Sequence, residues 1–209
     1  MKYILLLLIG IAVASCEAQP QASPEYISKL ETHRANYKES FLQEENSPLT
    51  AEETNLLDFY AADADYLCSC SVERTADAKP FEVDTYAGKK KTYIKHGVAT
   101  CTVKGKEIAL SLYKILRLQS MPGYRDYLFV PYMDHTNGES TYGGGRYLDL
   151  NVNQIDKEGQ ITIDFNKSYN PYCAFSDGYN CPIPPLENHL DLPIHAGEKN
   201  YQGTKKHKD

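Results

Sequence analysis

The feature that most constrains the fold is a change of hydrophobic period near Tyr66. From this point side chains alternate with a period of two, so that Tyr66, Cys68 and Cys70 share one face of an extended chain. Similar short segments follow, with turn residues and no helical pattern between them. They are 66–72, 81–85, 91–95, 98–103, 108–116, 127–132, 146–152, 160–164 and 190–195. Eight or nine short strands without intervening helices predict a mainly β, antiparallel sheet.

The edges of such a sheet must be covered, and closure into a barrel removes them. We therefore expect an antiparallel meander barrel or sandwich, which either packs its interior or encloses one small ligand. One or two helices should precede the strands. Ser23-Pro24-Glu25 combines an N-cap, a first-turn proline and an acidic residue, and the helical pattern continues to about Glu45. Thr50-Ala-Glu-Glu53 is a capping-box pattern that predicts a short second helix, ending near Phe59.

The first fifteen residues resemble a bacterial export signal. Lys2 precedes an apolar stretch, Ile4–Val13, which is too short to cross a bilayer core of about 30 Å as a helix. Small residues then lead to Cys16 in a pattern similar to a lipobox, in which the cysteine is acylated and becomes the new N-terminus. We therefore expect a lipoprotein of the bacterial cell envelope, with membrane lipid as its partner. A plain secretory signal is the alternative.

The remainder of the chain is expected to form one domain. Residues 1–15 would be the signal peptide, 16–23 a tether, 24–198 a single β-rich domain and 199–209 a basic, flexible tail. The formal net charge is −6. An acidic chain argues against nucleic acid as a partner, because binding to phosphates needs clustered lysine and arginine.

Four long motifs lie in the C-terminal half of the chain. They are Thr141-Tyr-Gly-Gly-Gly-Arg-Tyr-Leu-Asp-Leu150, Asp164-Phe-Asn-Lys-Ser-Tyr-Asn-Pro-Tyr-Cys-Ala174, Cys181-Pro-Ile-Pro-Pro-Leu-Glu-Asn188 and Ala196-Gly-Glu-Lys199. Together they closely resemble the bacterial and archaeal family known as domain of unknown function 1684. The resemblance is tight after Leu128 and looser upstream, and His189 departs from the arginine that we expect at its position. The family implies no reaction, so the chemistry must be argued from the residues.

Arg146 is the first candidate for ligand contact. The glycines before it permit positive φ and a close approach of the backbone, and its planar guanidinium suits a carboxylate or phosphate. We therefore expect a binding or interaction module with a pocket for a small anionic ligand. The expected ligand-binding residues are Arg146, Gly144, Gly145, Asn166, Asn170 and Asn188. A buried ion pair of Arg146 with Asp164 or Glu187 is the structural alternative.

An enzyme is the second functional hypothesis. In a hydrolase or lyase, Asp164 or Glu187 would act as general base and Arg146 would stabilise the developing negative charge. Strand alternation places Asp149 on the face opposite Arg146, so these two side chains should not meet. The carboxylates and amides of this region suit calcium or magnesium, but no EF-hand spacing is present, and we expect neither a metal nor another cofactor.

Five cysteines follow Cys16, and export would place them in an oxidising compartment. Cys173 and Cys181 bracket a short, proline-rich loop and are the candidate disulfide, which would stabilise the fold by roughly 2–3 kcal/mol. Cys101 can pair with either Cys68 or Cys70, which leaves one thiol free. The chain also has 17 tyrosines and no tryptophan. Several tyrosines cluster in the motifs, where they suit a ligand pocket and the wet end of a barrel equally well.

Overall fold

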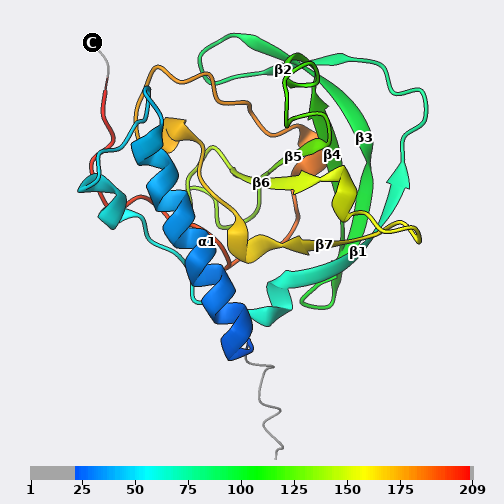
Figure 1. The fold of residues 1–209 in the computed structure, drawn as a ribbon, viewed down its shortest axis with the longest axis horizontal. Coiled ribbons are helices and arrows are strands. Elements are labelled where there is room, and N and C mark those ends of the chain that lie inside the picture. The colour runs from blue at the N-terminus through cyan, green and yellow to red at the C-terminus, as the bar shows by residue number, and fades with distance from the viewer. Residues whose placement is uncertain (1–21, 208–209) are drawn as a thin grey trace, which may run out of the picture.

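The computed structural model describes residues 22–207, in which one helix lies beside a curled antiparallel sheet (Figure 1). Helix α1 spans Pro24–Gln43. The strands are β1 (Leu67–Arg74), β2 (Phe81–Asp84), β3 (Lys90–Val103), β4 (Lys106–Ile115), β5 (Tyr127–Tyr132), β6 (Arg146–Asn151) and β7 (Gln160–Asp164). The described part of the chain is thus mainly β, with a half-barrel sheet of seven strands, and it confirms the predicted class.

The strands follow the order β6-β5-β4-β3-β1-β7, and β2 pairs with β3 outside this path. Two of the predicted strands, 91–95 and 98–103, are one continuous strand, β3. A register shift between Lys95 and Gly97 bends it, and a Cβ on Gly97 would lie only 2.5 Å from the carbonyl oxygen of Glu73. The predicted strand 190–195 is wrong. That segment is a loop whose apolar side chains fill the inside of the curl.

Helix α1 begins as predicted, because Ser23 Oγ accepts a hydrogen bond from the Tyr26 N–H at 3.2 Å. The second predicted helix is reduced to a single 3₁₀ turn, Glu53–Leu56. Its capping box is present, since the Thr50 N–H donates to Glu53 Oε2 at 2.8 Å. The turn does not continue because Leu57 is extended, with ψ 124°.

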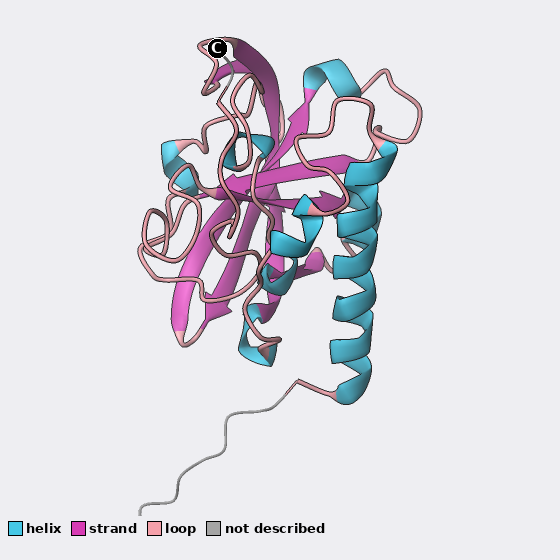
Figure 2. Ribbon diagram, turned by 90° about the vertical axis from the view of Figure 1, so that its left-hand side faces the viewer, coloured by secondary structure: helices cyan, strands magenta, loops and turns pink. Residues whose placement is uncertain are grey.

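The sheet has two differently built faces. One face and the loop at 190–196 form the main aliphatic core, which includes Leu110, Leu128, Val130, Leu148 and Ile163. The opposite face carries a smaller aromatic cluster, made of Val83, Tyr93, Tyr113, Phe129 and Tyr147. Helix α1 runs alongside the strands, as the rotated view of Figure 2 shows. A third cluster, around Phe41 and Phe175, joins the helix to the C-terminal loops.

A disulfide joins Cys70 on β1 to Cys101 on β3. The two residues are directly opposite in the strand register, with their Cα atoms 4.4 Å apart. This pairing settles the alternative left open by the sequence and leaves Cys68 as a buried thiol. Because the bond closes a loop of 31 residues, chain entropy predicts that it stabilises the fold by roughly 3–4 kcal/mol.

The expected signal peptide, the acylated Cys16 and most of the tether (16–21) lie outside the described residues, as do the last two positions of the tail. None of the described helices is both long and apolar enough to cross a bilayer. Residues 199–207 differ from the predicted flexible tail, because they pack against the domain. Three lysines form ion pairs there, which join Lys199 to Asp58, Lys205 to Asp177 and Lys206 to Glu53.

Candidate ligand-binding pocket

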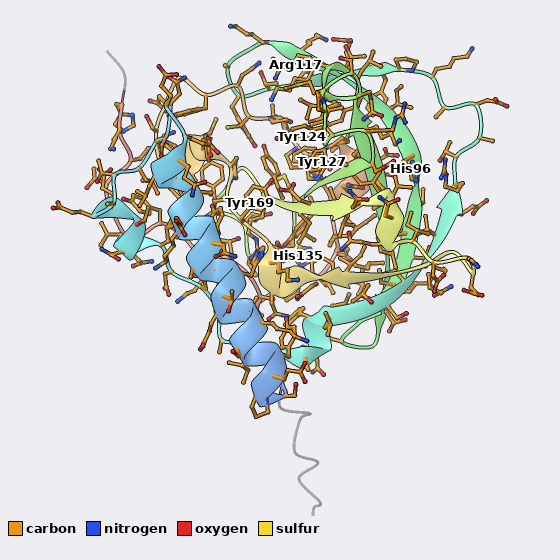
Figure 3. All side chains as sticks on the ribbon, in the orientation of Figure 1. His96, Arg117, Tyr124, Tyr127, His135 and Tyr169 are labelled. Carbon is orange, nitrogen blue, oxygen red and sulfur yellow. A yellow bond between two sulfur atoms is a disulfide. The ribbon has the colours of Figure 1, made fainter. Side chains whose placement is uncertain are left out.

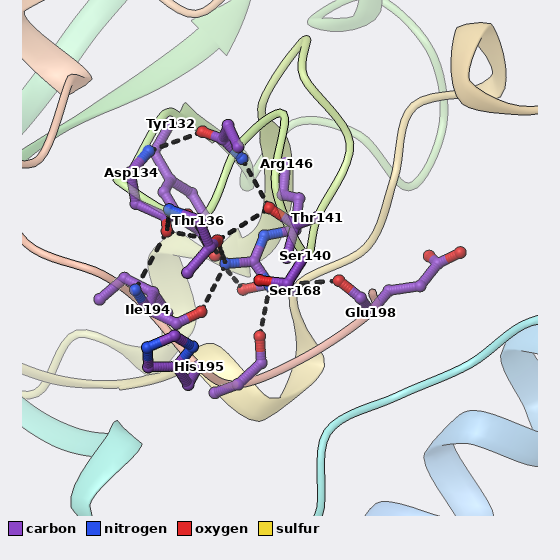
Figure 4. Close-up of polar contacts among 12 residues, drawn as sticks. Tyr132, Asp134, Thr136, Ser140, Thr141, Arg146, Ser168, Ile194, His195 and Glu198 are labelled. Atoms are coloured by element: carbon purple, nitrogen blue, oxygen red, sulfur yellow. Dashed lines mark hydrogen bonds and ion pairs between the residues drawn. The ribbon is translucent and has the colours of Figure 1, made fainter. Parts of the chain in front are cut away.

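Arg146 lies on the core face of β6 and is completely buried. Its Nη2 donates to Asp134 Oδ2 and to the carbonyl oxygen of Ile194, both at 2.8 Å, and its Nη1 donates to the carbonyl oxygens of Ala196 and Glu198 (Figure 4). The ion-pair partner is therefore Asp134, and neither Asp164 nor Glu187 as the structural alternative expected. This network ties β6 to the loop at 194–198, and its geometry argues against the expected contact of Arg146 with an anionic ligand.

The glycines before Arg146 serve the same packing. Gly145 has φ +83°, and a Cβ there would lie 2.6 Å from the carbonyl oxygen of Tyr132 and 2.8 Å from Pro184 Cγ. A Cβ on Gly144 would lie 2.4 Å from the Tyr142 ring. The two positions thus allow the close approach of neighbouring parts of this chain, whereas we expected them to allow the approach of a ligand.

The two candidate general bases lie in separate environments. Asp164 ends β7, where its Oδ1 accepts from the Tyr26 hydroxyl at 2.8 Å and from the Asn166 N–H at 3.1 Å. Glu187 is partly exposed in the 3₁₀ turn Leu186–Asn188 and is bonded to Lys95 and Tyr113. Neither carboxylate contacts Arg146, so the structure does not bring together the three residues of the enzyme hypothesis.

The three asparagines predicted to bind a ligand also lie in different parts of the structure. Asn188 is buried between β4 and β5, where its Nδ2 donates to the carbonyl oxygens of Ser111 and Pro131. Asn170 donates to the carbonyl oxygen of Lys199 at 2.8 Å. Asn166 anchors the loop before β1 and also lines the pocket described next.

A cavity of about 520 Å³ lies between α1, the aromatic face of the sheet and the segment 165–182. Volumes of this size are typical of small-molecule sites. Seven aromatic rings line it: Tyr37, Phe59, Phe129, Tyr147, Tyr169, Tyr172 and Tyr179. The other lining side chains are mostly polar or charged. The cavity therefore combines apolar walls with a few polar groups, as ligand pockets usually do.

Asp149 on β6 supplies a carboxylate to this cavity. Its Oδ1 accepts hydrogen bonds from two phenols, those of Tyr127 at 2.7 Å and Tyr169 at 2.8 Å, and Figure 3 labels both tyrosines. Asp149 is exposed where it lines the cavity, although many protein atoms surround it. The resulting loss of solvation raises the pKa of Asp149, and the two phenolic donors oppose that rise.

Tyr169 is held in place by the edge of the sheet. Its backbone forms a bridge to Tyr147, with N···O distances of 2.9 Å and 3.0 Å in the two directions. This bridge covers the outer edge of β6. The Tyr169 ring also contacts the Tyr37 ring of α1, with centroids 5.9 Å apart. The loop, the strand and the helix thus meet at one tyrosine.

A buried acid lies behind the helical wall of the cavity. Glu198 is completely buried, and its Oε2 accepts from the Tyr37 hydroxyl at 3.0 Å and from the Asn170 N–H at 2.8 Å. Burial raises the pKa of Glu198 to about 7, although these two hydrogen bonds oppose the shift. Glu198 does not line the cavity and supports Tyr37 from the rear.

Basic groups also line the cavity, and two of them have other partners. The Arg34 guanidinium lies 4.8 Å from the centre of the Phe59 ring and donates to the carbonyl oxygen of Tyr60. Lys167 Nζ lies 3.6 Å from Asp164 Oδ2. Lys91 is half-buried near Cys181, and burial lowers the pKa of its ammonium group.

Cys173 and Cys181 are neighbouring thiols, and Cys181 lines the cavity. The Cys173 N–H donates to Cys181 Sγ at 3.2 Å, and Cys173 Sγ lies 3.3 Å from the carbonyl oxygen of Tyr179. The loop therefore brings the two cysteines together, but in the structure they are not bonded. Their disulfide stays a prediction.

The residues that sequence reasoning missed are Asp149 and the tyrosines around it. The alternation along β6 correctly separates Arg146 from Asp149, but the glycines and the guanidinium favour the arginine face as the site. A charged residue between two apolar neighbours, in a chain segment rich in tyrosine, was the available signal. Within residues 22–207, no group of three or more histidine, cysteine, aspartate and glutamate side chains is arranged to hold a metal ion.

Comparisons with known proteins agree with this architecture. The structure is similar to the solution NMR structure of an uncharacterised protein from gene locus rrnAC0354 of Haloarcula marismortui, with a TM-score of 0.65 and 28% sequence identity. The match covers 84% of this chain and 94% of the archaeal one. No curated protein matches significantly. The family model described as "Protein of unknown function (DUF1684)" matches residues 53–199, and this chain belongs to that family.

Proposed function

We propose that this protein is a small-ligand-binding module whose site is the cavity between α1, the aromatic face of the sheet and the segment 165–182. The observation that carries the proposal is the position of Asp149, a carboxylate held by two phenols inside an aromatic cavity of about 520 Å³. Asp149 is exposed where it lines this cavity, so its charge and its open acceptor positions face the space that a ligand would occupy.

The expected ligand site therefore moves from Arg146 to the opposite face of β6. Arg146 and its partner Asp134 have no exposed side-chain surface, which supports a role in holding the loop at 194–198. The proposed site does not include Gly144, Gly145, Asn170 or Asn188, because each of these residues packs against or bonds to other parts of the protein. Asn166 stays in the proposed site as one of the cavity's polar groups.

A variant that fills the cavity tests this function. Ser40 of α1 lines the cavity, and Ser28 of the same helix is exposed to solvent. We expect soluble aromatic fragments to shift the NMR resonances of cavity residues in the wild type and in the control Ser28→Phe. The same shifts should be lost in Ser40→Phe. If fragments shift the same residues in Ser40→Phe as in the wild type, the cavity is not the binding site.

The cellular setting of the proposal is a lipid anchor at Cys16 in the bacterial cell envelope. The support for it is the sequence pattern at residues 1–16. Expression in a bacterium with an alkyne-labelled fatty acid should label the wild type and place it in the membrane fraction. The Cys16→Ala variant should remain unlabelled. Labelling of Cys16→Ala would contradict this assignment.

A further inference from the structure

Only one oxygen of the Asp149 carboxylate is hydrogen-bonded within the described part of the chain. Two phenols donate to its Oδ1, whereas no described residue donates a hydrogen bond to its Oδ2. An ionised carboxylate accepts about four hydrogen bonds, two at each oxygen. The open acceptor positions lie on a side chain that lines the cavity. A ligand with N–H or O–H donors would complete this group.

The charge of Asp149 also lacks a partner. Among residues 22–207, no lysine, arginine or histidine forms an ion pair with it, although basic side chains line other parts of the cavity. Arg34 stacks on Phe59, and Lys167 lies beside Asp164. A carboxylate is stabilised more by a cation than by a neutral donor, because both charge attraction and hydrogen bonding then act on it.

The rings around Asp149 favour the same kind of ligand. Tyr147 lies between Phe129 and Tyr169, with ring centroids 4.8 Å and 5.8 Å away, and all three rings line the cavity. The π-face of an aromatic ring attracts cations, and the attraction grows when water is excluded. The same rings also offer apolar contact to the body of an organic molecule.

We propose that the ligand is a protonated organic amine, whose ammonium group donates to Asp149 Oδ2 while its apolar or aromatic body lies against the rings of Phe129, Tyr147 and Tyr169. This inference rests on the proposed binding function and names the chemical class of the ligand. It reverses the sign of the charge that the sequence suggested. The anion expected at Arg146 is replaced by a cation at Asp149.

Three probes of nearly equal shape test the charge. Benzylammonium is cationic at pH 7, benzyl alcohol is neutral and benzoate is anionic, and each carries the same ring. In titrations followed by two-dimensional NMR of the full chain, we expect benzylammonium to bind at least tenfold more tightly than benzyl alcohol. Benzoate should bind most weakly. This comparison uses the wild type and so does not depend on the folding of any variant.

The Asp149→Asn variant tests the residue. Its amide oxygen can still accept from Tyr127 and Tyr169, so only the charge and one acceptor are lost. The affinity for benzylammonium should fall to within about threefold of that for benzyl alcohol. Asp191→Asn is the matched control, because Asp191 has 84% of its side chain exposed and lies outside the cavity. It should bind as the wild type does.

The outcomes separate the two proposals. If benzyl alcohol or benzoate shifts the cavity residues as strongly as benzylammonium, the amine class is wrong and the binding function stands. The same conclusion follows if Asp149→Asn keeps the preference for benzylammonium. If none of the three probes perturbs any cavity residue at millimolar concentration, the cavity is not a binding site and both proposals fail.

Discussion

The two faces of β6 carry charges of opposite sign in different environments, one buried and paired and the other open to a cavity. Arg146 on the core face is completely buried and forms an ion pair with Asp134 at 2.8 Å, and backbone carbonyls accept further N–H groups of its Nη1 and Nη2, whereas its Nε has no hydrogen-bond partner among the described residues. Asp149 on the aromatic face lines a cavity and has two phenolic donors, and no basic side chain within residues 22–207 forms an ion pair with it. A charge that the fold pairs with a buried opposite charge serves the structure, and a charge left open toward a cavity is available to another molecule.

Among the variants considered, removal of Arg146 should lower the stability of the fold most. We expect Arg146→Ala to lower the free energy of unfolding by about 3–5 kcal/mol, because it leaves the buried Asp134 carboxylate without a cation. Urea denaturation at pH 7 measures the change. The double variant Arg146→Ala/Asp134→Asn should recover part of the loss, since it removes the unpaired charge. A loss below about 1 kcal/mol in the single variant would contradict the structural role of Arg146.

Glu198 should make the stability of the fold depend on pH. Its pKa is raised from 4.5 to about 7, so the unfolded state loses its proton at a lower pH than the folded state does. The stabilising contribution of the protonated acid is complete below about pH 4.5 and is lost as the pH rises to about 7. A shift of this size corresponds to roughly 3 kcal/mol.

Glu198→Gln is the measurement for this shift. The wild type should lose stability relative to the variant between pH 5 and pH 8, because glutamine cannot ionise and its amide oxygen still accepts from Asn170. Urea unfolding of both proteins at the two pH values gives the difference. Equal stability changes in the two proteins would show that Glu198 keeps an ordinary pKa.

The glycine before Arg146 tests how tightly the core face is packed. Gly145→Ala should cost about 2 kcal/mol more than Gly123→Ala, because both glycines have φ +83° but only Gly145 has atoms within 4 Å of the new Cβ. Thermal unfolding of the two variants isolates the crowding from the backbone strain. Equal losses would mean that Tyr132 and Pro184 move aside freely.

Asp149→Asn should have the smallest effect on stability. The pKa of the carboxylate is raised, so its charge already costs free energy, and we expect a change within about 1 kcal/mol, with the variant equal or slightly more stable at pH 7. Thermal unfolding at pH 7 checks it. A loss above about 2 kcal/mol would place Asp149 with Arg146 among the residues that hold the fold, and the contrast between the faces would disappear.

The sheet was predictable because strand alternation is a local property. The period of two placed Arg146 and Asp149 on opposite faces, and the structure confirms it. The capping residues likewise predicted the start of α1. The segment 190–195 carried a similar apolar pattern, but Leu190, Leu192 and Ile194 belong to a loop that fills the curl, and an apolar pattern alone does not require strand pairing.

The site was less predictable because its parts are distant in the sequence. Tyr37 on α1, Phe129 on β5 and Tyr169 after β7 meet only in the folded chain. Arginine beside three glycines resembles a ligand site in sequence, whereas its ion-pair partner, Asp134, lies outside the four family motifs. The choice between Cys68 and Cys70 as the partner of Cys101 also required the strand register.

The helical wall of the cavity has a kinetic consequence. Within residues 22–207, no backbone hydrogen-bond ladder joins helix α1 to the sheet, so side chains hold it in place. Phe41 packs against the C-terminal loops, and the Tyr26 and Tyr37 hydroxyls donate to Asp164 and Glu198. Elements held in this way open locally more easily than central strands do. The rate of ligand release would then follow the opening of α1, and amide hydrogen exchange in this helix should slow when the cavity is occupied.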